Sequence, residues 1–66
     1  MFLLVQRTDT LPEMRALVNT AHIVAALPVG GGARTKLYLA IGEAWEISLP
    51  FSRVVSLLRE EVEASV

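Results

Sequence analysis

A glycine-rich segment followed by two cations is the part of this chain in which residue types and spacing come nearest to a known chemistry. Gly30, Gly31 and Gly32 precede Arg34 and Lys36, a combination that suggests a phosphate-binding loop. Such a loop requires the spacing G-x-x-x-x-G-K-[ST] and leads into a helix, whose N-terminus supplies aligned donors. Here the spacing differs and a strand-like sequence follows. We therefore expect a mobile connection between strands. The alternative is a loop that becomes ordered on a partner, with Arg34 and Lys36 contacting acidic groups.

Acid–base or metal chemistry would need histidines and carboxylates that converge. His22 is the only histidine, cysteine is absent, and a single imidazole does not build a zinc site by itself. We expect His22 to hydrogen-bond the backbone of a turn. Glu43 and Glu46 are an odd number of positions apart, so we expect them to point to opposite faces of a strand and not to form a carboxylate pair. We predict no catalytic residue, no metal, no cofactor and a protein that is not an enzyme.

Two aromatic side chains are candidates for packing and recognition. Tyr38 and Trp45 fall on opposite faces of a predicted hairpin, and Trp45 shares its face with Ile47 and Leu49. We expect the Trp45 face to pack under a helix, which leaves Tyr38 on the helix-free face. Because tyrosine is enriched at interface hot spots, Tyr38 is the contact residue that we predict. The alternative is a half-exposed tyrosine that contacts nothing.

Strands must position these residues, and apolar side chains with a period of two predict where the strands lie. Asn19 to His22 predicts a turn inside a long extended stretch, because asparagine hydrogen-bonds its own backbone. Both faces of the stretch from Ile23 to Leu27 are apolar, as in a strand buried on two sides. We expect Pro28 to end that strand and a two-residue turn at Gly42-Glu43 to join the last two strands. The extended stretches expected are residues 2–8, 15–27 with the interruption, 36–41 and 45–49.

A change of period from two to about 3.6 at Pro50 predicts one amphipathic helix that continues to Glu63. Ser48 is its expected cap, with Pro50 in the first turn. Acidic residues near its C-terminal end oppose the helix dipole, so we expect the last turn to fray. The apolar face comprises Phe51, Val54, Val55, Leu58 and Val62, and the acids are Glu60, Glu61 and Glu63.

Sixty-six residues allow one domain, which we expect to be α+β: a small antiparallel sheet of about four strands with one C-terminal helix packed on one face. A chain this short buries about 60% of the surface that its unfolded form exposes, so its core is marginal. With no cysteine for a disulfide and 53% apolar residues, self-association is the readiest source of further burial. We predict a homo-oligomer whose subunits meet on the helix-free face, through Val24, Ala26, Tyr38 and Ala40.

Charge and hydropathy argue against nucleic acid and membranes as partners. The net charge is −1 and the six basic residues are scattered, whereas nucleic-acid affinity needs them gathered. Residues 16–33 lack charged side chains, but Asn19, His22, Pro28 and three glycines interrupt them, so no span of about 20 apolar residues remains. We expect a soluble cytoplasmic protein whose partners are its own copies and, in addition, another protein.

The order of several residues is similar to that of a known family. Val18-Asn19 and Ile23 come first, then Leu37-Tyr38-Leu39 with Gly42, then Trp45-Glu46-Ile47, Val54-Val55 and Leu57-Leu58. In this order the chain resembles the small flagellar and swarming-motility proteins of the FlbD type and similar short phage proteins. In these, an asparagine precedes a strand with isoleucine, a glycine hairpin follows, and a helix with a valine-rich face closes the chain. The resemblance implies a small regulatory or accessory protein of bacterial or phage type.

The second half of LytTR DNA-binding domains has the same order and carries basic residues around the asparagine step. Thr20, Ala21 and His22 stand there in this chain. We therefore predict a non-enzymatic protein-interaction or accessory module that works as a homo-oligomer. A DNA-binding module with a LytTR-like sheet is the alternative, and an affinity for duplexes that falls steeply with salt would indicate it.

Overall fold

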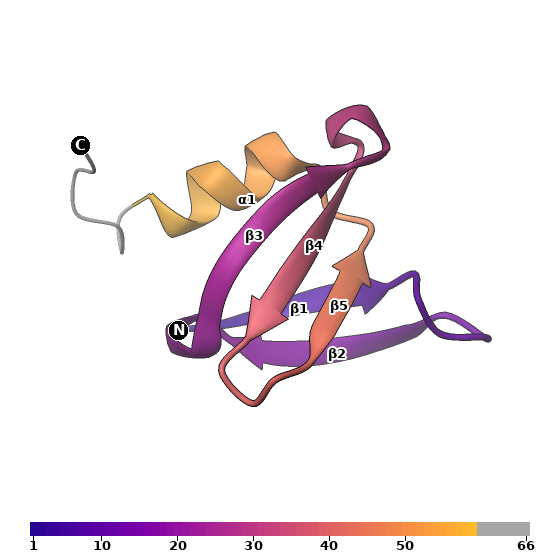
Figure 1. Ribbon diagram of the computed structural model, residues 1–66, viewed down its shortest axis with the longest axis horizontal. Coiled ribbons are helices and arrows are strands. Elements are labelled where there is room, and N and C mark those ends of the chain that lie inside the picture. Colours follow the sequence, from indigo (N-terminus) through magenta and orange to yellow (C-terminus); the bar gives the residue numbers. More distant parts are fainter. Residues whose placement is uncertain (60–66) are drawn as a thin grey trace.

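Five strands and one α-helix follow one another in the computed structural model, which describes residues 1–59 (Figure 1). The strands are β1 Phe2–Arg7, β2 Met14–Asn19, β3 Ile23–Val29, β4 Arg34–Leu39 and β5 Ala44–Ile47, and the helix is α1 Phe51–Leu58. A single turn of 3₁₀ helix, η1 Thr20–His22, joins β2 to β3, and a glycine turn whose three residues all have positive φ, η2 Gly30–Gly32, joins β3 to β4. The sheet order is β2-β1-β5-β4-β3, with all neighbours antiparallel. The predicted α+β fold is confirmed, with five strands where about four were expected.

The sheet has two parts, a hairpin of β1 and β2 and a meander of β3, β4 and β5. In the described chain β1 pairs with β5 at one position, where Arg7 faces Ile47. The N–H of Thr8 extends this junction by donating to the carbonyl of Glu46 at 2.8 Å. Because the junction is short, the hairpin turns away from the meander and lies across its lower end in Figure 1.

The core lies between the inner faces of the hairpin, the meander and α1. The hydroxyl of the fully buried Thr35 donates to the carbonyl of Leu49 at 2.8 Å, so it fixes the connection from β5 to α1. Elements from both parts of the sheet contribute, which makes burial of the core depend on their docking. The buried apolar residues are Val5, Val18, Leu37, Leu39, Ile47 and Val54.

The helix α1 packs its apolar side against β3 and β4. Val54 is buried and Leu58 packs against the core, as the period of 3.6 predicts. Val55 is 42% exposed and lies outside the covered face, which is therefore narrower than the sequence pattern suggests. Within residues 1–59 no helix has the length and apolar character needed to cross a bilayer.

The start of α1 differs from the prediction. Pro50 is itself the N-cap and makes no side-chain capping bond. Ser48, the predicted cap, instead donates its N–H to the carbonyl of Gln6 at 3.0 Å and so belongs to the β1–β5 junction. The predicted continuation of the helix through Val62, with the acids Glu60, Glu61 and Glu63, lies outside the described residues.

A bulge in β3 changes the predicted direction of its side chains. Ile23 pairs with Leu39, but the next pair is Ala25 with Tyr38, so Val24 is an extra residue on β3. A bulge of this kind shifts every following side chain to the other face. The alternation counted from the sequence is therefore correct only up to Ile23.

The rest of β3 runs along an edge of the sheet. The prediction that this strand is buried on both faces is wrong, because several of its side chains are exposed. Ala26 pairs with the buried Leu37 and packs against the core, whereas Leu27 is exposed. Pro28 does not end the strand, since it continues to Val29. An edge strand tolerates proline because one side of its backbone needs no ladder partner.

The predicted turns are present, one of them with a different length. At η1, the side-chain oxygen of Asn19 accepts the N–H of Ala21 at 3.1 Å, which confirms the expected asparagine turn. The β4–β5 connection is a three-residue loop, since Gly42 donates to the carbonyl of Leu39 at 2.9 Å and Leu39 donates to the carbonyl of Glu43 at 2.8 Å. Gly42 has a φ of 91°, the left-handed conformation that such a loop requires at its last position.

Candidate binding site beside strand β2

Arg34 and Lys36 lie on β4 and not in the glycine segment, and both contact residues of the meander. Arg34 Nε donates to Glu46 Oε1 at 3.0 Å, and Lys36 Nζ lies 5.4 Å from the ring centroid of Tyr38. Gly30 has a φ of 60°, and a Cβ atom there would lie 3.1 Å from the Arg34 guanidinium. Glycine therefore leaves room for the Arg34–Glu46 pair. Contact of these cations with an acidic partner stays a prediction.

The four residues predicted to form an oligomer interface do not share one face. Tyr38 is half-buried on the outer side of the meander, and Val24 is exposed in the bulge. Ala40 is exposed in the loop after β4. Ala26 packs against the core, so its assignment to the helix-free face is wrong. The cause is the extra residue in β3, which a period of two does not reveal.

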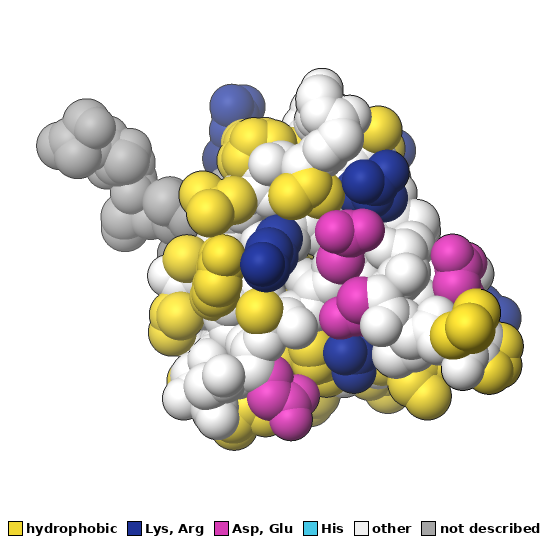
Figure 2. Space-filling model, turned by 45° about the vertical axis from the view of Figure 1, so that its right-hand side comes forward, with side chains coloured by type: hydrophobic (Ala, Val, Ile, Leu, Met, Phe, Trp, Pro, Cys, Tyr) yellow, Lys and Arg dark blue, Asp and Glu magenta, His cyan; other side chains and the backbone are white. Residues whose placement is uncertain are grey.

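The outer face of the meander carries opposite charges at neighbouring positions. Lys36 lies opposite Leu27 on β3 and opposite Glu46 on β5, and Glu46 also accepts the bond from Arg34. Opposite charges across strands stabilise a solvent-exposed sheet face. Figure 2 shows basic and acidic side chains adjacent to one another on the face that it presents.

The outer face of the hairpin carries exposed apolar side chains beside the polar pair Gln6 and Arg15. Leu4 of β1 lies directly opposite Leu17 of β2, and their side chains are 58% and 64% exposed. Phe2 precedes Leu4 by two positions, so it lies on the same face, and it is 63% exposed. We call Phe2, Leu4 and Leu17 the hairpin patch. Neighbouring exposed apolar side chains of this kind mark interaction surfaces.

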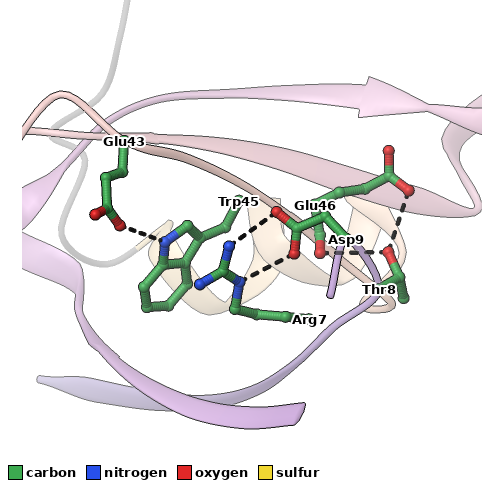
Figure 3. A network of polar contacts seen from close by, with 6 residues as sticks. All are labelled: Arg7, Thr8, Asp9, Glu43, Trp45 and Glu46. Atoms are coloured by element: carbon green, nitrogen blue, oxygen red, sulfur yellow. Dashed lines mark hydrogen bonds and ion pairs between the residues drawn. The ribbon is translucent and has the colours of Figure 1, made fainter. Parts of the chain in front are cut away.

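Trp45 stands between the two parts of the sheet and is held by two charged residues (Figure 3). The guanidinium carbon of Arg7 lies 4.5 Å from the centroid of the indole ring. The indole N–H donates to Glu43 Oε1 at 3.0 Å. These two contacts fix the orientation of the indole ring.

A carboxylate holds Arg7 in place. The Nε and Nη2 atoms of Arg7 donate to the two carboxylate oxygens of Asp9, each at 3.0 Å. The hydrogen bond from Arg7 keeps the pKa of Asp9 below its usual value, and the same bond raises the pKa of Arg7. Both groups are therefore charged at neutral pH, which maintains the cation over the Trp45 ring.

Glu46 receives hydrogen bonds from both parts of the sheet. Thr8, just after β1, donates its hydroxyl to Glu46 Oε1 at 3.1 Å, the oxygen that also accepts from Arg34 of β4. Glu43, in the loop before β5, bonds instead to Trp45, so the two carboxylates have different partners. The Glu46 side chain fastens the end of β1 to β5.

A shallow depression of about 140 Å³ lies beside the C-terminal end of β2. Its walls are mostly apolar, and the ring of Trp45 forms part of them. The amide oxygen of Asn19 at its rim is already used by Ala21. The residues that line this depression, which we call the β2 pocket, are Leu17, Val18, Asn19, His22, Leu39, Ile41 and Trp45.

The β2 pocket has the character of a site for an apolar side chain. His22 is exposed, and its backbone carbonyl accepts the N–H of Ala40 at 2.8 Å; this bond does not involve the imidazole, whose expected hydrogen bond to the backbone stays a prediction. Among residues 1–59 no three histidine, aspartate or glutamate side chains gather in a way suited to a metal ion. Apolar walls with few polar groups are typical of recognition pockets.

Sequence reasoning did not find the β2 pocket or the Arg7–Trp45 contact. The pocket combines β2, η1, β4 and β5, which meet only through the sheet order β2-β1-β5-β4-β3. The spacing of Arg7 and Asp9 on either side of a strand end was the one local signal for their ion pair.

No family model matches the chain, and no curated protein or solved structure matches it. The resemblance to FlbD-type proteins and to LytTR domains therefore stays a prediction.

Proposed function

We propose that this protein is a non-enzymatic interaction module that works as a homo-oligomer in a regulatory or accessory role. The observation that carries the proposal is the hairpin patch. Leu4 and Leu17 are directly paired and more than half exposed, and Phe2 continues the same apolar surface. A subunit with this face in water gains by covering it.

The size of the core supports the same proposal. The described chain has six buried apolar residues, and no disulfide is available to a chain without cysteine. Domains of this length commonly obtain further burial by association. The outer face of the meander is a poorer candidate, because Lys36 and Glu46 lie opposite each other there and would have to lose water.

The chemistry of the β2 pocket favours binding over catalysis. Among residues 1–59, His22 is the one titratable side chain that lines it, and a general base needs a partner or a substrate proton within hydrogen-bond reach. Trp45 offers apolar contact area instead.

The proposal is tested by the mass of the pure protein in solution, measured by light scattering over a concentration series. We expect a mass that rises to a defined multiple of 7.2 kDa. A mass that stays at 7.2 kDa over the whole series would contradict self-association.

A further inference from the structure

We propose that two copies of this chain pair through their β2 edges around a twofold axis at Leu17, and that Met14 of each copy fills the β2 pocket of the other. The inference rests on the proposed function and specifies its interface. Closed twofold dimers are the commonest form of homo-oligomer. The partner is a second copy because the edge and the pocket complement each other, as the following steps show.

The free edge of β2 presents unpaired backbone groups. In the described chain β2 is the last strand of the sheet on its side. The N–H of Thr20, just after β2, donates to the carbonyl of Met1 at 2.8 Å. Successive residues of an antiparallel strand direct their N–H and C=O groups to opposite edges. The residues whose backbone groups point away from β1 are therefore Arg15, Leu17 and Asn19.

The two edge strands of the sheet, β2 and β3, differ in how readily their backbones could pair with a further strand. On β3, the extra residue Val24 interrupts the ladder and Pro28 occupies the strand, two features that discourage pairing with another chain. On β2, six residues pair with β1 without a register shift, and the strand contains no proline. The β2 edge is thus the one ready to accept a strand.

A pairing centred on Leu17 continues the hairpin patch across the axis. Leu17 then faces the partner's Leu17, and Leu4 flanks it in each copy, so four leucine side chains form one row across four strands. In this register Arg15 faces the partner's Asn19, and no like charges are opposed. A register displaced by two residues would place Arg15 against an apolar leucine.

The same register brings a flexible apolar side chain to each β2 pocket. Met14 lies on the inner side of β2 with Val18, because the two are an even number of positions apart. Centred on Leu17, the pairing places Met14 opposite the partner's Thr20, between the partner's Asn19 and the partner's His22, which line the pocket. Met14 is 50% exposed, and methionine adapts to irregular apolar cavities.

Amide hydrogen exchange tests the edge directly, because it distinguishes the N–H groups of β2 that point toward β1 from those that point away from it. At concentrations where the protein is associated, we expect slow exchange of the Leu17 and Asn19 amides, and fast exchange after dilution to the monomer. The Ala16 and Val18 amides bond to β1, so they should be slow in both conditions. Fast exchange of the Leu17 amide in the associated state would overturn the proposal.

Proline substitution tests the same edge by its effect on mass. Arg15→Pro removes an N–H that points outward, whereas Arg15→Ala removes the same charge and retains the N–H. Because each dimer loses two backbone bonds, we expect Arg15→Pro to raise the dissociation constant at least about tenfold over Arg15→Ala. Equal dissociation constants in the two variants would overturn the edge pairing. A urea titration of each variant at low concentration verifies that both fold.

Met14→Ala tests the occupant of the pocket, and it should weaken association by about tenfold because two pockets lose their filling. The outcomes separate this inference from the proposed function. A wild-type protein that stays monomeric overturns both. An oligomer that resists Arg15→Pro and Met14→Ala but dissociates with Tyr38→Glu overturns the β2 interface and leaves the oligomeric function in place.

Discussion

The outer faces of the hairpin and the meander present different kinds of side chain to water. On the meander, Lys36 and Glu46 lie opposite each other and Arg34 bonds to Glu46, so the exposed face is polar and satisfied. On the hairpin, Leu4 and Leu17 occupy the equivalent paired positions and remain exposed. Both parts cover one core with their inner faces. The difference shows that the exposed cross-strand pairs are charged between β4 and β5 and apolar between β1 and β2, while β3 at the far edge also carries the exposed Val24 and Leu27.

A substitution at the junction between hairpin and meander should have the largest effect, a loss of free energy of unfolding. Ile47 is fully buried, faces Arg7 across β1 and β5, and faces Thr35 across β4 and β5. We expect Ile47→Ala to lower the free energy of unfolding by about 3 kcal/mol, measured by urea denaturation, because it leaves a cavity where hairpin and meander dock. Val24→Ala, at a position exposed in the bulge, is the matched control and should change it by less than about 0.5 kcal/mol. Equal effects would show that the parts do not share a core.

Two matched polar substitutions, one on each outer face, should have the next largest effect, which is on self-association. They compare the two faces directly. Leu4 on the hairpin and Leu27 on the meander are exposed to similar extents, 58% and 51%. We expect Leu4→Gln to weaken self-association about tenfold and Leu27→Gln to leave it unchanged, as followed by sedimentation equilibrium. The reverse order would place the interface on the meander.

Lowering the pH should have the smallest effect on stability, through the Arg7–Asp9 pair beside Trp45. The pKa of Asp9 is lower in the folded protein than in the unfolded chain, so its contribution to stability is present above the unfolded value of about 4 and is lost as the pH falls through the lower folded value. We expect the fluorescence of Trp45 to change in that range as the guanidinium leaves the ring. Asp9→Asn should remove this transition, at a cost in stability below about 1 kcal/mol because the pair is near the surface. A transition that persists in Asp9→Asn would assign it to another group.

The fold class could be predicted from the sequence because periods of two and 3.6 are local properties. The approximate strand positions and the placement of Trp45 with Ile47 on the inner face followed from alternation, and the turn at Asn19 followed from the residue type. The direction of Ala26 did not, because one extra residue in β3 reverses the alternation without altering composition. The start of α1 was misplaced because the chain stays extended as far as Pro50, and the Ser48 N–H continues the pairing with the distant β1.

The candidate site was less predictable than the fold. The β2 pocket requires the hairpin to lie beside the loop that joins β4 and β5, and that arrangement depends on the sheet order and not on any local pattern. Arg7 and Glu43 are far apart in sequence, and only the folded chain brings them to the same indole ring. Exposure of Leu17 also depends on the fold, since alternation alone does not say which face of a hairpin is covered.

One oxygen atom has a consequence for motion within the subunit. Glu46 Oε1 accepts from Thr8 at the end of the hairpin and from Arg34 at the start of β4. The Arg34 bond lies within the meander and fixes the position of the carboxylate, whereas the Thr8 bond crosses to the hairpin. A rotation of the hairpin against the meander would therefore break the Thr8 bond and leave the Arg34 bond in place, so Arg34 holds the acceptor ready for the hairpin to dock again.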